Sequence, residues 1–189
     1  FQSICGVKRY LDEKDISSLP PTEQVDQKGC LFDQAPIAEQ LNAIVTDQFD
    51  AISAVRSSLA PLTAAVRGAL QRLRGTQGRL VYAGAGCSIR IGVQDGVELV
   101  PTFGWPLVRL CYLIAGGLSA LSQSIEGAED DADAAALQVS DFDIGIEDVV
   151  IGIAASGNTP FTCQALQSSR DRGALTIAVT CNPKAQLVA

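Results

Sequence analysis

Two short stretches of small and hydroxyl-bearing residues could bind an anion. Residues 82–88 read YAGAGCS and residues 153–159 read IAASGNT, and each lies between an apolar run and a segment with helical spacing. Free N–H groups at a helix start attract anions, glycine allows a close approach to the backbone, and a serine hydroxyl adds a hydrogen bond. We expect the pair to hold a phosphate and a neighbouring sugar hydroxyl. The alternative is that Ser88, Ser156 and Thr159 are ordinary N-caps.

The first stretch does not fit a nucleotide-binding motif. A dinucleotide fingerprint needs a third glycine where this chain has Ile89, and an acidic residue at the end of the second strand, which is also missing. The sequence contains no GxxxxGK[ST] motif, which excludes the ATP-binding P-loop.

Two glutamates are candidates for moving a proton. The chain has no histidine, so Ser-His-Asp and Cys-His arrangements are excluded and acid–base chemistry would come from groups such as carboxylates. Glu98 lies among apolar residues in DGVELVPTFGWP, where its pKa could be raised. Glu129 lies in the acidic run SIEGAEDDADA, whose other interpretation is a solvated helix start, above all for Asp130, Asp131 and Asp133.

Composition limits the partners and the compartment. A net charge of −7 disfavours a nucleic-acid partner. The sequence has neither the apolar run of roughly 18–20 residues that a membrane span needs nor a signal-peptide core, so we expect a cytoplasmic protein. Six scattered cysteines predict reduced thiols, not disulfides or a zinc site, and no metal is expected. Because the chain does not begin with Met, we expect it to be a piece of a longer one.

The pattern of the chain predicts an α/β fold. Residues 1–35 are expected to form an extended arm, and residues 36–75 a helical hairpin whose apolar stripe packs on the domain or on a partner subunit. Short apolar runs at 79–84, 108–117, 148–156 and 175–182 predict strands buried on both faces. Helical spacing is expected between them, at 89–99, at 118–127 leading into 131–139, and at 160–172. Residues 76–189 thus predict a doubly wound parallel sheet.

Several segments together resemble the N-acetylmuramic acid 6-phosphate etherases. The order and spacing of GAGCSIR, DGVELVPTFGWP, IEGAEDD, DVVIGIAASGNTPF and GALTIAVTCNP follow that family, and LPPTEQVD resembles its N-terminal arm. The resemblance runs from Thr22 to Pro183. It implies a sugar isomerase (SIS) domain, a flavodoxin-like fold that binds phosphosugars. Family chains are longer, with a further helical part, so the resemblance also implies that the domain continues beyond this chain.

The resemblance implies a reaction and a set of site residues. Family members remove the D-lactyl ether from a phosphorylated amino sugar as homodimers, without a metal or organic cofactor. From the net charge and the missing apolar run we also expect no nucleic-acid partner and no membrane partner. By motif position, Glu98 and Glu129 match the two acid–base glutamates. The positions that match the two phosphosugar-binding loops are Gly86, Cys87 and Ser88, and Ser156, Gly157, Asn158 and Thr159.

The first loop differs from the family pattern, and this leaves other functions open. The family reads GTSGR where this chain has GCSIR, so Cys87 replaces a hydroxyl donor by a weak one. Ile89 stands at a glycine position, where we expect it to crowd a ligand or change the backbone. One alternative is a non-catalytic phosphosugar sensor, a role that glucokinase regulatory protein, which resembles the same family, fills. Another is an aldose–ketose phosphosugar isomerase.

Overall fold

A four-stranded parallel sheet forms the centre of the computed structural model, which describes Thr22, Gln24 and residues 29–188. Its strands are β1 (Leu80–Gly84), β2 (Leu110–Ile114), β3 (Val149–Ile153) and β4 (Leu175–Val179). They lie in the order β2-β1-β3-β4 and every neighbouring pair is parallel. The predicted parallel sheet is therefore confirmed. Strand β1 ends at Gly84 as predicted, and the other three strands end three residues before the predicted runs do. The predicted burial on both faces is wrong for β4, whose residues are half-buried or exposed.

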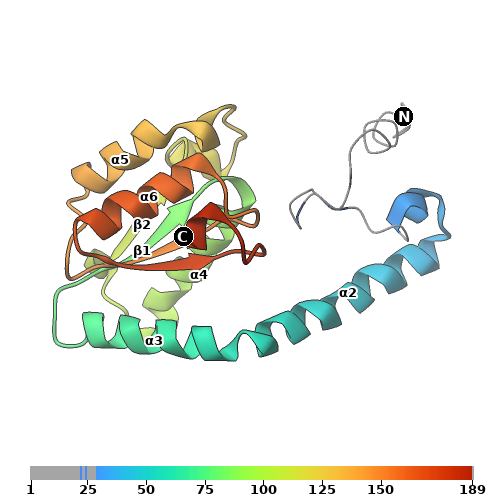
Figure 1. Cartoon of the computed structure of the whole chain (residues 1–189), viewed down its shortest axis with the longest axis horizontal. Helices are drawn as coiled ribbons and strands as arrows, with labels where there is room; N and C mark the ends of the chain where they lie inside the picture. Colours follow the sequence, from blue (N-terminus) through green and yellow to red (C-terminus); the bar gives the residue numbers. More distant parts are fainter. Residues whose placement is uncertain (1–21, 23, 25–28, 189) are drawn as a thin grey trace. The chain divides into compact units, whose positions relative to one another are not determined.

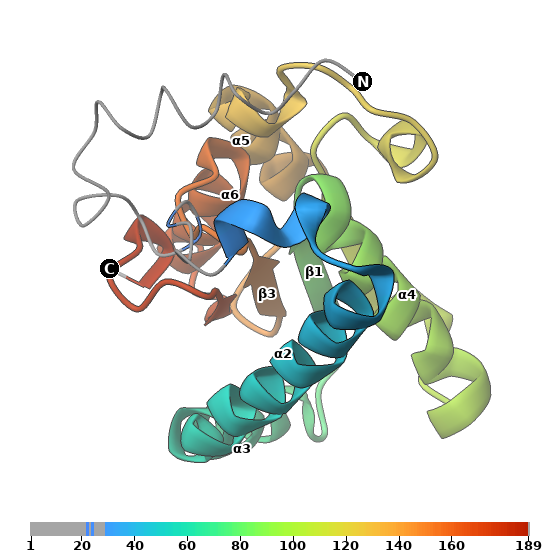
Figure 2. The same ribbon diagram turned by 90° about the vertical axis from the view of Figure 1, so that its right-hand side faces the viewer.

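Helices cover both faces of the sheet, as the prediction of a doubly wound fold requires. Helix α4 (Gly86–Phe103) lies on one face, and α5 (Ala132–Asp141) and α6 (Pro160–Asp171) lie side by side on the other (Figures 1 and 2). Successive side chains of β1 alternate between the faces. Val81 and Ala83 belong to the core under α5 and α6, whereas Tyr82 packs with Ile89 of α4.

The prediction of a helix at residues 118–127 is wrong. The structure has only two short 3-10 turns between β2 and α5, at Leu118–Leu121 and at Ala128–Asp130. The guanidinium of Arg90 donates to the carbonyl oxygens of Ala120 (2.9 and 3.1 Å) and Gln123 (3.0 Å). Those oxygens would otherwise accept helical N–H groups, so a tertiary contact overrides the local helical preference.

The N-terminal elements precede the sheet domain. They are a 3-10 turn at Gly29–Gln34, α2 (Ile37–Ser57) and α3 (Leu59–Leu73). Residues 29–34 are therefore helical where an extended arm is predicted, and most of that arm lies outside the described residues. The chain divides into two compact units after Ala64, inside α3, so the predicted division at residue 75 stays a prediction. Among the described helices, none is long and apolar enough to cross a membrane.

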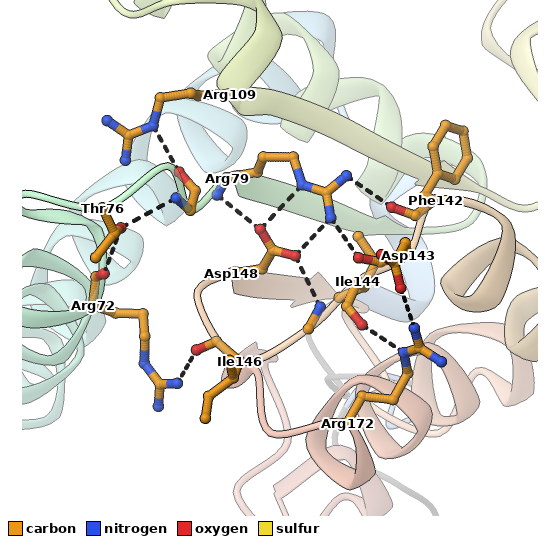
Figure 3. A network of polar contacts seen from close by, with 12 residues as sticks. Arg72, Thr76, Arg79, Arg109, Phe142, Asp143, Ile144, Ile146, Asp148 and Arg172 are labelled. Atoms are coloured by element: carbon orange, nitrogen blue, oxygen red, sulfur yellow. Dashed lines mark hydrogen bonds and ion pairs between the residues drawn. The ribbon is translucent and has the colours of Figure 1, made fainter.

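A polar network holds the amino ends of the strands (Figure 3). The carboxylate of Asp148 accepts from the backbone N–H groups of Arg79 (2.8 Å) and Gly145 (2.9 Å), and from the Arg79 guanidinium (2.7 and 3.1 Å). Burial alone would raise the pKa of Asp148, but these hydrogen bonds outweigh it and lower the pKa. Arg72 donates to the carbonyls of Ile146 and Gly173 in the same network.

The free edge of β2 is bonded to a side chain. Oε1 of Gln138 in α5 accepts from the backbone N–H of Ile114, and Nε2 of Gln138 donates to the backbone carbonyl of Ile114, both at 3.0 Å. Ile114 is the last residue of β2. The amide group therefore pairs with this strand end as a neighbouring strand would.

Candidate phosphosugar site

Two segments at the carboxyl ends of neighbouring strands form the candidate site. We call Ala85–Ser88, after β1, loop 1, and Ala154–Thr159, after β3, loop 2. The last residues of the two strands, Gly84 and Ile153, are partners in the parallel register, so the loops leave the sheet side by side. A Cβ atom on Gly84 would lie 2.8 Å from the Ile153 carbonyl oxygen, so only glycine fits at this close approach. In open α/β sheets, ligands bind at this edge.

Loop 1 is the first turn of α4. The helix begins at Gly86, whose φ of +54° suits glycine, and the first helical bond runs from Ile89 N to Ala85 O (3.3 Å). The backbone N–H groups of residues 86–88 have no partner within the helix. Gly86 and Cys87 are exposed and Ser88 is half-buried. The turn can therefore offer its N–H groups, the Ser88 hydroxyl and the positive end of the helix dipole to an anion.

Ile89 points into the core and not towards a ligand. Its side chain is fully buried and packs with Tyr82, Ile114 and Ala120 between α4 and the sheet. The expectation that the Ile89 side chain crowds a ligand at the loop is therefore wrong. The side chain fills space on the sheet side of the helix, opposite to the exposed edge of loop 1.

Loop 2 is a tight turn before α6. Gly157 has a φ of +69°, and the Ser156 Oγ accepts from the Asn158 N–H at 3.2 Å. That bond uses a lone pair of the Ser156 hydroxyl and leaves its O–H free to donate. Thr159 occupies the N-cap position of α6, and Pro160 is the first helical residue.

The N-cap interpretation of the three hydroxyls fits only in part. The N-cap of α4 is Ala85, and Ser88 lies three residues inside the helix. Thr159 has the N-cap position, but its side chain makes no cap hydrogen bond within the described part of the chain. The Ser156 hydroxyl bonds within its own turn. Of these three, then, none satisfies a helix end as an N-cap side chain does.

A third segment, Thr180–Leu187 after β4, packs against loop 2; we call it loop 3. A Cβ atom on Gly157 would lie 2.3 Å from Ala185 Cβ and 2.6 Å from Thr180 Oγ1. Backbone N–H groups of loop 3 also donate to loop 2, in the bonds Cys181 N to Ala155 O (3.0 Å), Leu187 N to Gly157 O (2.9 Å) and Gln186 N to Asn158 Oδ1 (2.9 Å). The sequence reasoning did not assign loop 3 to the site, although TCNP at its start resembles a family segment.

The two candidate glutamates are not enclosed. Glu98 is exposed, and it lies nine residues after Ile89, hence on the side of α4 that faces away from the sheet. The apolar surroundings expected for it are absent from the described part of a single chain. Glu98 also lies ten residues beyond Ser88, which is about 15 Å along the helix axis. One chain therefore does not bring Glu98 to its own loop 1.

Glu129 is exposed in the 3-10 turn Ala128–Asp130, which packs against α6 through the half-buried Ala128. This places Glu129 beside the helix that loop 2 begins. Asp131 accepts from the Ala134 N–H at 2.9 Å and caps α5, so the interpretation of this acidic residue as a helix start is confirmed.

Comparisons with known proteins agree with the fold and with the resemblance. Residues 62–170 match the family model described as "Glucokinase regulatory protein N-terminal SIS domain". The chain is 46% identical over 169 residues to an N-acetylmuramic acid 6-phosphate etherase from Deinococcus radiodurans, covering 89% of this chain and 55% of that protein. It is 39% identical over 166 residues to an etherase of the same name from Rubrobacter xylanophilus, covering 88% of this chain and 55% of that protein. The chain thus spans about half the length of these relatives.

Solved structures show the same fold. A phosphoheptose isomerase from Francisella tularensis has a TM-score of 0.59 at 18% identity, covering 77% of this chain and 76% of that chain. A phosphoheptose isomerase from Neisseria gonorrhoeae has a TM-score of 0.56 at 17% identity, with the same coverage. The predicted resemblance to the etherases and the predicted SIS-type fold are both confirmed.

Proposed function

The chain belongs to the glucokinase regulatory protein N-terminal SIS domain family, and from this premise we propose that it is the phosphosugar-binding part of an N-acetylmuramic acid 6-phosphate etherase, a carbon–oxygen lyase. The observation that carries the proposal is the 46% identity to such an etherase over 169 residues. The substrate is a 6-phosphorylated amino sugar, and the products are D-lactate and N-acetylglucosamine 6-phosphate.

The phosphate binds between loops 1 and 2. The donors proposed for it are the free N–H groups of Gly86, Cys87 and Ser88 and the hydroxyls of Ser88, Ser156 and Thr159, with Gly157 and Asn158 completing the turn. Support comes from the adjacency of the loops and from the two helices that begin there. Such donors hold a phosphate without a metal ion.

The chemistry is an elimination followed by an addition. A glutamate takes the proton at C2 of the open-chain sugar, and the electron pair forms a C2–C3 double bond as the C3–O bond to lactate breaks. The second glutamate protonates the leaving lactyl oxygen and, now a carboxylate, takes a proton from the water whose hydroxyl adds at C3, while the first glutamate returns its proton to C2. Two carboxyl groups with different surroundings can divide these roles. Glu98 and Glu129 are the proposed pair.

We propose a homodimer in which Glu98 acts on the loops of the partner subunit. The outward position of Glu98 on α4, about 15 Å from Ser88, supports this arrangement. Apolar side chains on exposed parts of the same helix also support it, because Ile91 is 66% and Phe103 75% exposed. Because Cys87, Cys111, Cys163 and Cys181 are free thiols, we place the protein in the cytoplasm.

D-lactate release from N-acetylmuramic acid 6-phosphate tests the proposal. Glu98→Gln should abolish release, whereas Glu126→Gln, at an exposed acid near Glu129, should not. Mixing Glu98→Gln chains with Ser88→Ala/Ser156→Ala chains, both inactive alone, tests the dimer. If Glu98 acts across the dimer, random mixing restores about a quarter of the wild-type rate, because half of the dimers hold one complete site. No recovery would contradict action across the dimer.

A second candidate is a non-catalytic phosphosugar-binding regulator. The match to the SIS domain of glucokinase regulatory protein and the cysteine in loop 1 favour it. Thermal stabilisation by several hexose phosphates, with no release of lactate, would identify this function. Formation of a ketose phosphate would instead identify an isomerase.

A further inference from the structure

Asn182 of loop 3 is a buried polar residue that touches loop 2. It is 6% exposed, and its Nδ2 donates to the Ser156 carbonyl at 3.3 Å. Its Oδ1 accepts from the Lys184 N–H (3.0 Å), and its own N–H donates to Thr180 Oγ1 (3.1 Å). A buried amide is costly unless its hydrogen bonds are made, so this arrangement holds Asn182 in one orientation.

We propose that Asn182 is a positioning residue for phosphosugar binding: it fixes loop 2 so that the loop presents donors, not carbonyl oxygens, to the phosphate. The inference rests on the proposed function, because the ligand that it serves is the same phosphosugar. It adds to the site a residue of loop 3, the segment that follows β4.

The peptide group between Ser156 and Gly157 is where Asn182 acts. Its carbonyl oxygen is bonded to Asn182, and its N–H donates to the Ala154 carbonyl at 3.0 Å. Because the peptide group is planar, contacts on both sides fix its orientation, and with it the start of the Ser156 side chain. The Ser156 Oγ is then placed to accept from Asn158 N, and its O–H is left to donate to a ligand.

The carbonyl groups of the two adjacent residues, Ala155 and Gly157, are also bonded to loop 3. Ala155 O accepts from Thr180 Oγ1 (3.1 Å) as well as from the Cys181 N–H, and Gly157 O accepts from the Leu187 N–H. A carbonyl oxygen carries partial negative charge and would repel a phosphate. With three successive carbonyls occupied by loop 3, the face of loop 2 that is left carries hydroxyl groups and the start of α6. Loss of the Asn182 bond frees the middle carbonyl of the three.

The test replaces the amide by a carboxylate of the same shape. In Asn182→Asp, a carboxylate oxygen replaces the donor NH₂ group and faces the Ser156 carbonyl oxygen. Because the two oxygens repel, the peptide group between Ser156 and Gly157 should turn. Gln138→Glu is the matched control, because the half-buried Gln138 also has a side-chain amide that donates to a backbone carbonyl of a neighbouring segment, here at the end of β2. Thr180→Val is a milder second variant that removes the hydroxyl bonds to Ala155 and Asn182. Urea unfolding of each full chain confirms that it folds.

Two measurements are made on the folded variants. Calorimetry gives the Kd for N-acetylglucosamine 6-phosphate and for inorganic phosphate, and amide hydrogen exchange reports on residues 154–159 and 181–187. We expect Asn182→Asp to weaken phosphosugar binding about tenfold or more and to speed exchange at Leu187, with a smaller effect in Thr180→Val and none on Kd in Gln138→Glu. In a lactate assay the change should raise KM and leave kcat within about twofold.

The outcomes separate the two proposals. If the unaltered chain binds no phosphosugar, the proposed function is wrong. If it binds and Asn182→Asp binds equally well, or if Gln138→Glu weakens binding as much, the positioning role of Asn182 is overturned. A variant in which kcat falls and KM does not would also overturn it.

Discussion

Replacing Asp148 by asparagine should destabilise the fold more than any other single charge removal in the described polar network. Asparagine keeps one oxygen but presents an NH₂ group either to Arg79 or to the Gly145 N–H, so donor faces donor. The Asp148 side chain is 6% exposed and that of Arg79 26%. Leaving a buried charge without its partner costs about 3–5 kcal/mol, and we expect the lower end because Arg79 reaches solvent.

Urea unfolding at pH 7 measures this cost. With a slope of about 2 kcal/mol per M, a loss of about 3 kcal/mol lowers the urea midpoint by about 1.5 M. Asp143→Asn is the control, because Asp143 pairs with Arg172 at 2.5 Å but its side chain is 91% exposed, and asparagine tolerates its φ of 46°. That exposed pair is worth less than about 1 kcal/mol.

The pH dependence gives an independent test. The folded-state pKa of Asp148 lies below its ordinary value of 3.8, so its stabilisation is present above that value and is lost as the pH falls through the folded pKa. The difference between the wild type and Asp148→Asn should therefore shrink in acid. An unchanged midpoint at pH 7, or a difference that persists undiminished through acid, would refute the reasoning.

Three further results are expected. Thr162→Val should raise the free energy of unfolding by about 1 kcal/mol in thermal scans, because the Thr162 Oγ1 is buried without a partner among the described residues; a lower Tm would contradict this. Gly157→Ala should lower the urea midpoint far more than Gly86→Ala, because only at Gly157 would a Cβ collide with neighbours; equal midpoints would count against it. Iodoacetamide at pH 8 should modify exposed Cys87 well before Cys111, whose pKa is raised by burial, as mass spectrometry of digests would show.

The sequence predicts the sheet well because its signals are local. Runs such as LVYAG and VVIGI are apolar throughout, which is typical of strands covered on both faces. The start of α4 is harder to predict from the sequence, because the N-cap residue Ala85 has no side chain that could cap the helix and so does not mark where the helix begins. Once the helix is known to begin at Gly86, the spacing of Ile89, Gly92 and Gly96 places all three against the sheet, and the problem expected from Ile89 disappears.

The rest of the site depends on contacts between distant segments. Loop 3 joins loop 2 because β4 pairs with β3, and no local pattern around Asn182 reports that pairing. The short turns after β2 likewise depend on Arg90, about thirty residues earlier in the chain. The outward position of Glu98 could have been predicted from the sequence. Glu98 lies nine residues after Ile89, which places it on the side of the helix opposite to Ile89 and hence away from the sheet.

The bond pair between Gln138 and Ile114 has a consequence for how the protein behaves at high concentration. The outer edge of a parallel sheet is a template on which a strand of another molecule can add, and such growth leads to aggregates. At the end of β2 the N–H and C=O groups that an incoming strand would need are already occupied. The amide of Gln138 thus protects the protein from self-association through that part of its edge.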